Sequence, residues 1–123
     1  MNRPADTISI DELRLSLSEK AFQAEVRSEA VYHGWKVYAV WDSRKTPAGW
    51  PDLTLVRGTR LMFWELKKQK GRKPTDDQLA WLSALSGTGA ETAVYRPSDW
   101  ETIVSRLESV SYTHLTLPTN REV

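Results

Sequence analysis

Three residues in the middle of the chain have the types and the spacing needed for phosphodiester chemistry. Asp52 follows a proline and begins a short apolar segment, whereas Glu65 and Lys67 end the next apolar segment. In an antiparallel hairpin the start of one strand lies beside the end of its partner, so the two carboxylates should meet at one edge of a sheet. Glu65 and Lys67 are two residues apart and should therefore point to the same face.

A divalent cation is a natural partner for these carboxylates, because a carboxylate buried at the end of an apolar strand is costly without one. Magnesium prefers oxygen ligands, commonly one or two carboxylates with waters and phosphate oxygens. Asp52, Glu65 and the backbone carbonyl of Leu66 can supply the protein's share. The ion would polarise a phosphodiester, and Lys67 could orient water or neutralise developing charge. The alternative is a surface ion pair between Glu65 and Lys67, with Asp52 as a capping residue.

Two further polar residues are candidates for the same site. Glu19 shares a helix face with the apolar stripe Phe22, Val26 and Ala30, so it could reach the cation directly or through water. It could equally act only on the helix dipole, and the sequence leaves both open. Gln78 forms a capping-box pattern with Thr75, and it could also turn towards the site.

A run of basic residues follows the motif and is the candidate nucleic-acid contact. Such a cluster can hold phosphates even on a nearly neutral chain, although basic runs are often solvated loops. Ser43 and Arg44, in the loop before Asp52, could also contact phosphate, or belong to an ordinary loop. The run after Lys67 contains Lys68, Lys70, Arg72 and Lys73.

The elements that must position these residues alternate between helix and strand. The periodicity predicts an α/β fold in the order α-β-β-β-α-β-α, with a mixed sheet flanked by helices. Residues 61–66 are nearly all apolar, which indicates a central strand buried on both faces. The predicted helices are 18–33 (with a possible start at Asp11), 75–86 and 98–109, the last with Ser98 and Glu101 as a capping box, and the predicted strands are 35–41, 53–56, 61–66 and 91–95.

Bulk composition narrows the class of protein. The 123 residues suit one domain, and 40% hydrophobic content can fill one core. The chain has no cysteine, which excludes disulfides and thiolate metal sites, and its net charge is +1. No apolar run approaches the roughly 18 residues of a membrane span, and no secretory signal is recognisable, so we expect no membrane contact and a cytoplasmic location.

The two ends of the chain are set apart from the predicted domain, residues 11–109. Residues 1–10 lack periodicity and are interpreted as a flexible leader. Residues 110–123 follow a domain that is already complete, and VSYTHLTLPT resembles the translation of a transposon-type sequencing adapter. We expect this tail to be non-native; the alternative is a genuine tail.

The motif and its surroundings resemble the VRR-NUC (virus-type replication-repair nuclease) branch of the PD-(D/E)XK nucleases. The resemblance covers about residues 18–107, and its most specific block is GWPDLTLVRGTRLMFWELKKQKGR. It implies a restriction-endonuclease-like core and a Mg²⁺- or Mn²⁺-dependent phosphodiesterase. Asp52, Glu65 and Lys67 match the PD…ExK positions, Glu19 the acid of the first helix, and Gln78 the later glutamine.

Small stand-alone members of this family, common in phages and bacteria, resemble Holliday-junction resolvases in size and fold. The resemblance therefore implies a structure-selective DNA endonuclease acting as a homodimer, because one chain has one active site and a junction needs two cuts. Two alternatives remain open. One is a non-catalytic nucleic-acid-binding module of the same fold, and the other is a nuclease active only within a larger replication or restriction assembly.

Overall fold

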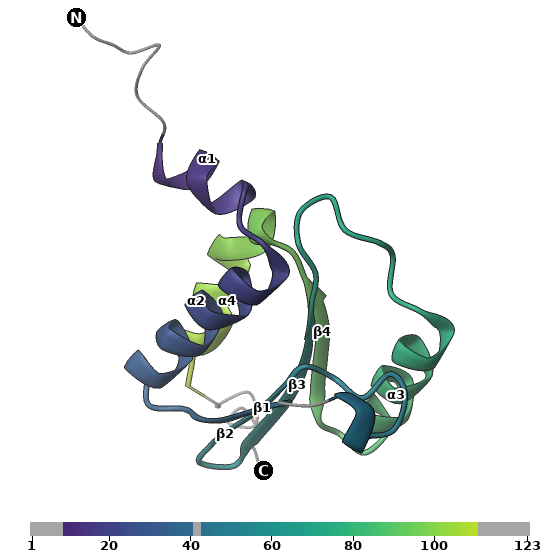
Figure 1. The fold of residues 1–123 in the computed structure, drawn as a ribbon. Coiled ribbons are helices and arrows are strands. Elements are labelled where there is room, and N and C mark those ends of the chain that lie inside the picture. Colours follow the sequence, from purple (N-terminus) through teal and green to yellow (C-terminus); the bar gives the residue numbers. More distant parts are fainter. Residues whose placement is uncertain (1–8, 41–42, 111–123) are drawn as a thin grey trace, which may run out of the picture.

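The sheet of this protein has four strands, with the longest in the interior. The computed structural model describes residues 9–40 and 43–110, so the leader up to residue 8, Trp41, Asp42 and the tail from residue 111 lie outside the described residues. The strand order is β1-β2-β3-β4, and only the β3–β4 pair is parallel (Figure 1). The strands are β1 (Lys36–Ala39), β2 (Leu53–Arg57), β3 (Arg60–Leu66) and β4 (Glu91–Tyr95).

Helices cover the sheet on both sides. Helices α2 and α4 lie on one side, and α3 lies on the other (Figure 1). The predicted order is confirmed, with a short helix added before it. The helices are α1 (Ile10–Leu15), α2 (Glu19–Tyr32), α3 (Asp76–Ser86) and α4 (Trp100–Glu108), with 3-10 helices η2 (Ser43–Lys45) and η3 (Pro97–Asp99).

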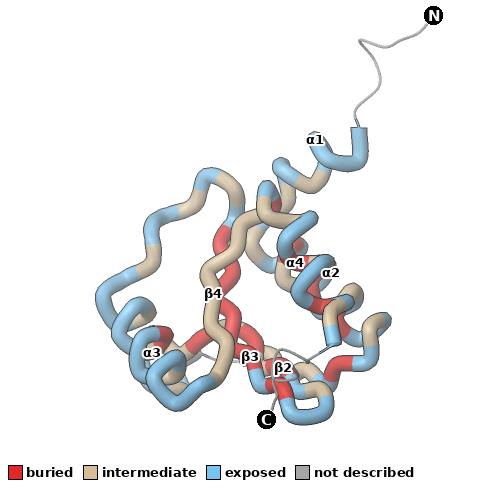
Figure 2. Tube along the Cα trace, turned by 180° about the vertical axis from the view of Figure 1, so that it is seen from behind, coloured by how far each residue is buried: buried red, intermediate tan, exposed pale blue. Residues whose placement is uncertain are grey.

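The core fills the space between β2, β3 and the α2–α4 layer. The predicted stripe Phe22, Val26 and Ala30 is fully buried. β3 is confirmed as an interior strand, because it pairs on both sides and its last five residues are all buried (Figure 2). Burial on both faces is why this strand has so few polar residues.

The helix predicted over residues 18–33 is confirmed as α2. The alternative start at Asp11 is wrong, because the Ser18 hydroxyl accepts a hydrogen bond from the Ala21 amide and starts α2 anew. The predicted start of the last helix is corrected. The predicted capping box of Ser98 and Glu101 is wrong. Residues 97–99 form η3 instead, held by the Arg96 amide donating to Asp99 Oδ2 over 2.8 Å, so α4 begins at Trp100.

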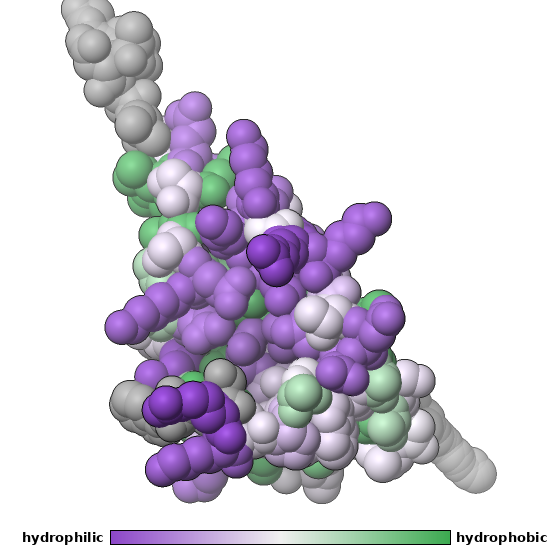
Figure 3. Space-filling view, turned by 45° about the vertical axis from the view of Figure 1, so that its right-hand side comes forward, coloured by the Kyte–Doolittle hydropathy of each residue, from purple (hydrophilic) through white to green (hydrophobic). Residues whose placement is uncertain are grey.

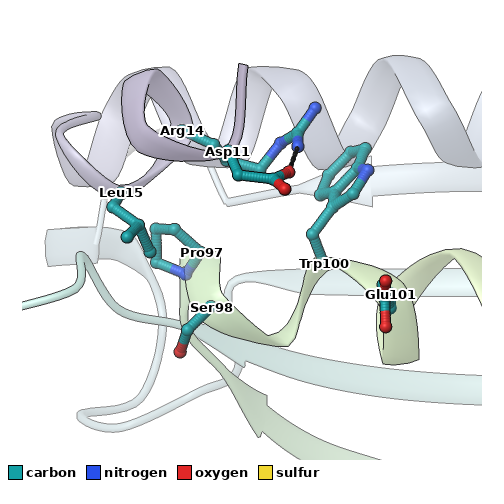
Figure 4. Close-up of a pocket in the computed structure, with 7 residues that line it drawn as sticks. All are labelled: Asp11, Arg14, Leu15, Pro97, Ser98, Trp100 and Glu101. Carbon is teal, nitrogen blue, oxygen red and sulfur yellow. Dashed lines mark hydrogen bonds and ion pairs between the residues drawn. The ribbon is translucent and has the colours of Figure 1, made fainter. Parts of the chain in front are cut away.

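Helix α1 contacts the end of the β4–α4 connection without burying any residue of its own. The Arg14 guanidinium lies 4.2 Å from the centre of the Trp100 ring and donates to Glu25 Oε1 over 2.9 Å. A pocket of about 270 Å³ remains between α1 and η3, and the Arg14 side chain on its α1 side donates to Asp11 of the same helix (Figure 4). None of the described helices is long and apolar enough to cross a bilayer.

Candidate active site

The β2–β3 hairpin brings Asp52 and Glu65 together, as the spacing predicts. Leu53 pairs with Trp64, so Asp52 and Glu65 are the next residues along the two strands. Asp52 Oδ2 accepts a hydrogen bond from the Leu66 amide over 2.8 Å, which holds its side chain against β3. The two carboxyl groups are close enough for each to perturb the pKa of the other.

Glu65 is surrounded by polar partners although it is only 2% exposed. Its Oε2 accepts from Gln78 Nε2 over 2.9 Å and lies 3.5 Å from Lys67 Nζ. Its Oε1 is buried without any hydrogen-bond partner in the structure. A buried carboxylate oxygen without a partner is costly, so this atom is open to a ligand that the protein itself does not provide.

Gln78 has both of the roles that the sequence left open. Its side-chain oxygen accepts from the Thr75 amide over 2.8 Å, which completes the capping box, and its amide nitrogen binds Glu65. Gly49 lets the preceding loop approach this turn of α3: its φ is +86°, and a Cβ there would lie 2.5 Å from the Asp77 carbonyl carbon. The loop before Asp52 therefore packs directly on the turn that carries Gln78.

Burial and like charge raise the pKa of both carboxyl groups. Desolvation is the largest cause for Glu65, followed by the charge of Asp52, and together they raise its pKa to about 8. Desolvation also raises the pKa of Asp52, with the charge of Glu19 adding to it and the bond from the Leu66 amide opposing it. Two carboxylates that repel each other in a buried site favour a proton or a cation between them.

The donor set fits a cation held partly by the protein. In residues 9–40 and 43–110, no three His, Asp or Glu side chains are grouped closely enough to hold an ion alone. Glu19 is half-buried and acts on Asp52 through its charge, so its role as a direct ligand stays a prediction. Asp52 and Glu65, with one unpartnered oxygen, match the usual magnesium arrangement of two carboxylates completed by water and phosphate oxygens.

The basic segment after β3 separates into one buried and several exposed residues. Lys67 is buried at the site, whereas Lys68, Lys70, Arg72 and Lys73 are exposed. Hydrophilic side chains cover much of the face shown in Figure 3. The exposure of the four residues is compatible with the predicted contact to phosphates, which stays a prediction.

Arg96 organises this loop, and the sequence analysis did not identify it. Its guanidinium donates to the carbonyl oxygens of Lys68 (2.6 Å), Gly71 (3.3 Å) and Arg72 (3.0 Å). The Ser98 amide adds a bond to Gln69 Oε1 over 2.9 Å. An arginine directly after a strand gives no local signal of this role, because its partners lie more than 20 residues earlier.

Ser43 and Arg44 lie in η2, in the connection that leads to Asp52. The Ser43 side chain lies outside the described residues, and Arg44 is exposed. Their predicted contact with nucleic acid therefore stays a prediction.

Comparison with known proteins identifies the fold. No protein-family model matches the chain, and no curated protein matches it significantly. Among solved structures, a "VRR_NUC domain" aligns with a TM-score of 0.61 at 21% identity, covering 73% of this chain and 97% of that one. A "VRR_NUC domain protein" aligns with a TM-score of 0.59 at 21% identity, covering 75% and 86%.

A structure of Archaeoglobus fulgidus Hjc, a Holliday junction resolvase from an archaeal hyperthermophile, aligns with a TM-score of 0.48 at 22% identity. It covers 63% of this chain and 67% of that one. The two stronger alignments show that the chain has the fold of VRR_NUC domains, which confirms the predicted fold class.

Proposed function

We propose that this chain, with its VRR_NUC fold, is a divalent-cation-dependent endonuclease that hydrolyses phosphodiester bonds in DNA. The observation that carries the proposal is the Oε1 atom of Glu65, which is buried near the Asp52 carboxyl group and has no hydrogen-bond partner. A role in an ion pair or a helix cap would leave this buried oxygen without a partner. A bound cation would coordinate it and complete its own ligand set with water and phosphate oxygens.

Each residue of the site has a distinct part in this proposal. Mg²⁺ or Mn²⁺ held by Asp52 and Glu65, with the Leu66 carbonyl as a further candidate ligand, would polarise the phosphodiester and acidify a water. Gln78 fixes the orientation of the Glu65 carboxylate, and the Leu66 amide fixes that of Asp52. Lys67 supplies a positive charge 3.5 Å from Glu65, where it neutralises charge that develops on the phosphate oxygens.

Branched DNA and a homodimer complete the proposal. The resemblance of the motif to stand-alone nucleases supports structure-selective cleavage, with Holliday junctions as the first substrate to test. The described residues contain one such site, so symmetric cleavage of a junction needs two chains related by a twofold axis. A bacterial or phage cytoplasm is the proposed location.

A cleavage panel tests the proposal. Four-way junction, flap, nicked-duplex and single-stranded DNA are incubated with Mg²⁺ or Mn²⁺. We expect cleavage of branched substrates that stops in excess chelator. Lys67→Ala should lower the rate about 10²- to 10³-fold, the loss typical when a transition-state donor is removed. Asp52→Asn should abolish cleavage, and its circular dichroism spectrum should match that of the unmodified protein.

Matched controls separate the site from general charge effects. Asp76→Asn removes an exposed carboxylate from the first turn of α3, and Lys36→Ala removes an exposed lysine from β1. Both should cut like the unmodified protein. Cleavage that persists in chelator or in Asp52→Asn would overturn the proposal. Salt-sensitive binding without turnover would favour the non-catalytic module, and turnover only after adding a partner would favour the assembly-dependent nuclease.

A further inference from the structure

Many basic side chains of this protein are occupied by structural contacts. Arg57 and Arg60 donate to backbone carbonyls at the end of α4, and Arg60 and Arg106 pair with Glu91. Others are exposed and form no ion pair with a described residue. These exposed basic residues include Lys20 and Arg27 on α2, Lys36 on β1, and Lys68, Lys70, Arg72 and Lys73 in the loop after β3.

Two of these cations line a groove that the predicted phosphate contacts do not include. The groove has a volume of about 440 Å³ and runs between α2 and the end of β1. Lys20 and Arg27 stand seven residues apart, two turns of the helix, which separates them by about 10 Å along its axis. The groove is lined by Lys20, Gln23, Ala24, Arg27, Ala39 and Val40.

This groove is joined to the candidate active site. The Val40 amide, in its wall, donates to the Asp52 carbonyl oxygen over 3.1 Å. Gln23, also in its wall, lies one helical turn after Glu19, whose charge acts on Asp52. The groove therefore lies beside the strand end that carries Asp52.

The chemistry of the groove fits a sugar–phosphate backbone. Among the described residues that line it, the two charged side chains are both positive and none is acidic. Strand phosphates lie about 3.4 Å apart along a duplex axis, so cations about 10 Å apart can contact two phosphates of one strand. Gln23 adds a neutral hydrogen-bonding group between them, and the two alanines contribute only small side chains to the groove.

We propose that the α2–β1 groove binds the backbone of the nucleic-acid strand as it leaves the candidate active site, through Lys20 and Arg27. This inference rests on the proposed function for the identity of the ligand, but it concerns binding and not hydrolysis. It adds a phosphate-binding surface, separate from the basic loop after β3.

Binding measured in EDTA tests the groove without any cleavage. Fluorescence anisotropy with a labelled four-way junction and a labelled duplex is followed across a series of KCl concentrations. Lys20→Gln and Arg27→Gln each remove one charge. Each should lower the slope of log K against log [salt] by about 0.9, and the double variant by about 2. Lys36→Gln, which removes an exposed lysine from the start of β1, should leave the slope unchanged.

The experiments can overturn the groove proposal and the nuclease proposal independently. If Lys20→Gln and Arg27→Gln keep the slope and affinity of the unmodified protein, the groove proposal is overturned even if the protein cuts DNA. The same holds if Lys36→Gln lowers the slope equally, because the effect then reflects net charge alone. A reduced slope in the groove variants supports the groove even where no cleavage is observed, and in that case only the nuclease proposal fails.

Discussion

At the scale of single residues, the site depends on how Glu65 is held. Its carboxyl group is almost fully buried, is bonded on one oxygen and is unpartnered on the other. Burial and the charge of Asp52 raise its pKa to about 8, so the cation-free protein keeps a proton on Glu65 at neutral pH. A bound cation would replace that proton, and binding would therefore depend on pH.

The first residue-scale prediction concerns stability without a cation. The pKa of Glu65 rises on folding, from 4.5 to about 8. The resulting stabilisation is fully present below pH 4.5 and is lost as the pH rises through about 8. We expect the free energy of unfolding in EDTA to fall by on the order of a few kcal/mol over this window. Urea denaturation at a series of pH values measures it.

Glu65→Gln is the matched control for this prediction, because it keeps the size and one hydrogen-bonding oxygen but cannot ionise. Its stability should vary less over the same pH window. Mg²⁺ should raise the melting temperature of the unmodified protein more at pH 8 than at pH 6, since fewer protons compete there. A free energy of unfolding that rises from pH 4.5 to about 8 in EDTA would contradict the upward shift of the Glu65 pKa.

At the scale of elements, the connection after β4 positions the basic loop. Arg96 bonds three carbonyl oxygens of residues 68–72, and Asp99 bonds the Arg96 amide in turn. The loop thus has a defined shape although it contains no helix or strand. A loop held in one conformation loses less entropy when it binds a ligand, which favours affinity.

The element-scale prediction is that Arg96→Ala weakens DNA binding without removing a phosphate contact. Loss of the bonds to the loop should lower affinity about tenfold, equivalent to about 1.4 kcal/mol. The turnover of bound substrate should change less. Hydrogen exchange of the amides in residues 68–72 should become faster, because the local opening free energy falls.

Arg96→Lys serves as the conservative control, since a lysine keeps the charge but cannot bridge three carbonyls with a planar fork. It should restore only part of the affinity. If Arg96→Ala left amide exchange in the loop unchanged while binding fell, Arg96 would contact the DNA itself instead of positioning the loop.

At the scale of the whole molecule, the described residues of one chain contain one candidate site. Two strand cuts at a junction therefore need two chains. The sheet carries Asp52, Glu65 and Lys67 at one edge, and α2 and α3 approach that edge from opposite faces (Figure 1). The α2–β1 groove and the basic loop adjoin the same edge.

The molecular-scale prediction is that junction cleavage needs a dimer. Sedimentation velocity should show two chains at the concentrations that give cleavage. Dimers formed from one unmodified chain and one Asp52→Asn chain should nick a single strand, since only one site can hold the cation. A monomer that introduces both cuts with undiminished rate would contradict the dimer.

Sequence alone determined the features that depend on neighbours along the chain. Apolar periodicity located the helices and strands, and hairpin spacing placed Asp52 beside Glu65 and Lys67 on the face of Glu65. It also identified the capping box of Thr75 and Gln78. These patterns are short-range consequences of backbone geometry, so they can be read without knowing the fold.

Only the tertiary structure decided which distant groups meet. Gln78 reaches Glu65, Arg96 reaches a loop 24 to 28 residues earlier, and α2 leaves a groove beside β1. Each of these contacts depends on the packing of helices against a twisted sheet, which no local spacing encodes. The start of α4 was mispredicted for a different, local reason: the Arg96 amide donates to Asp99 three residues later and forms η3 before the helix.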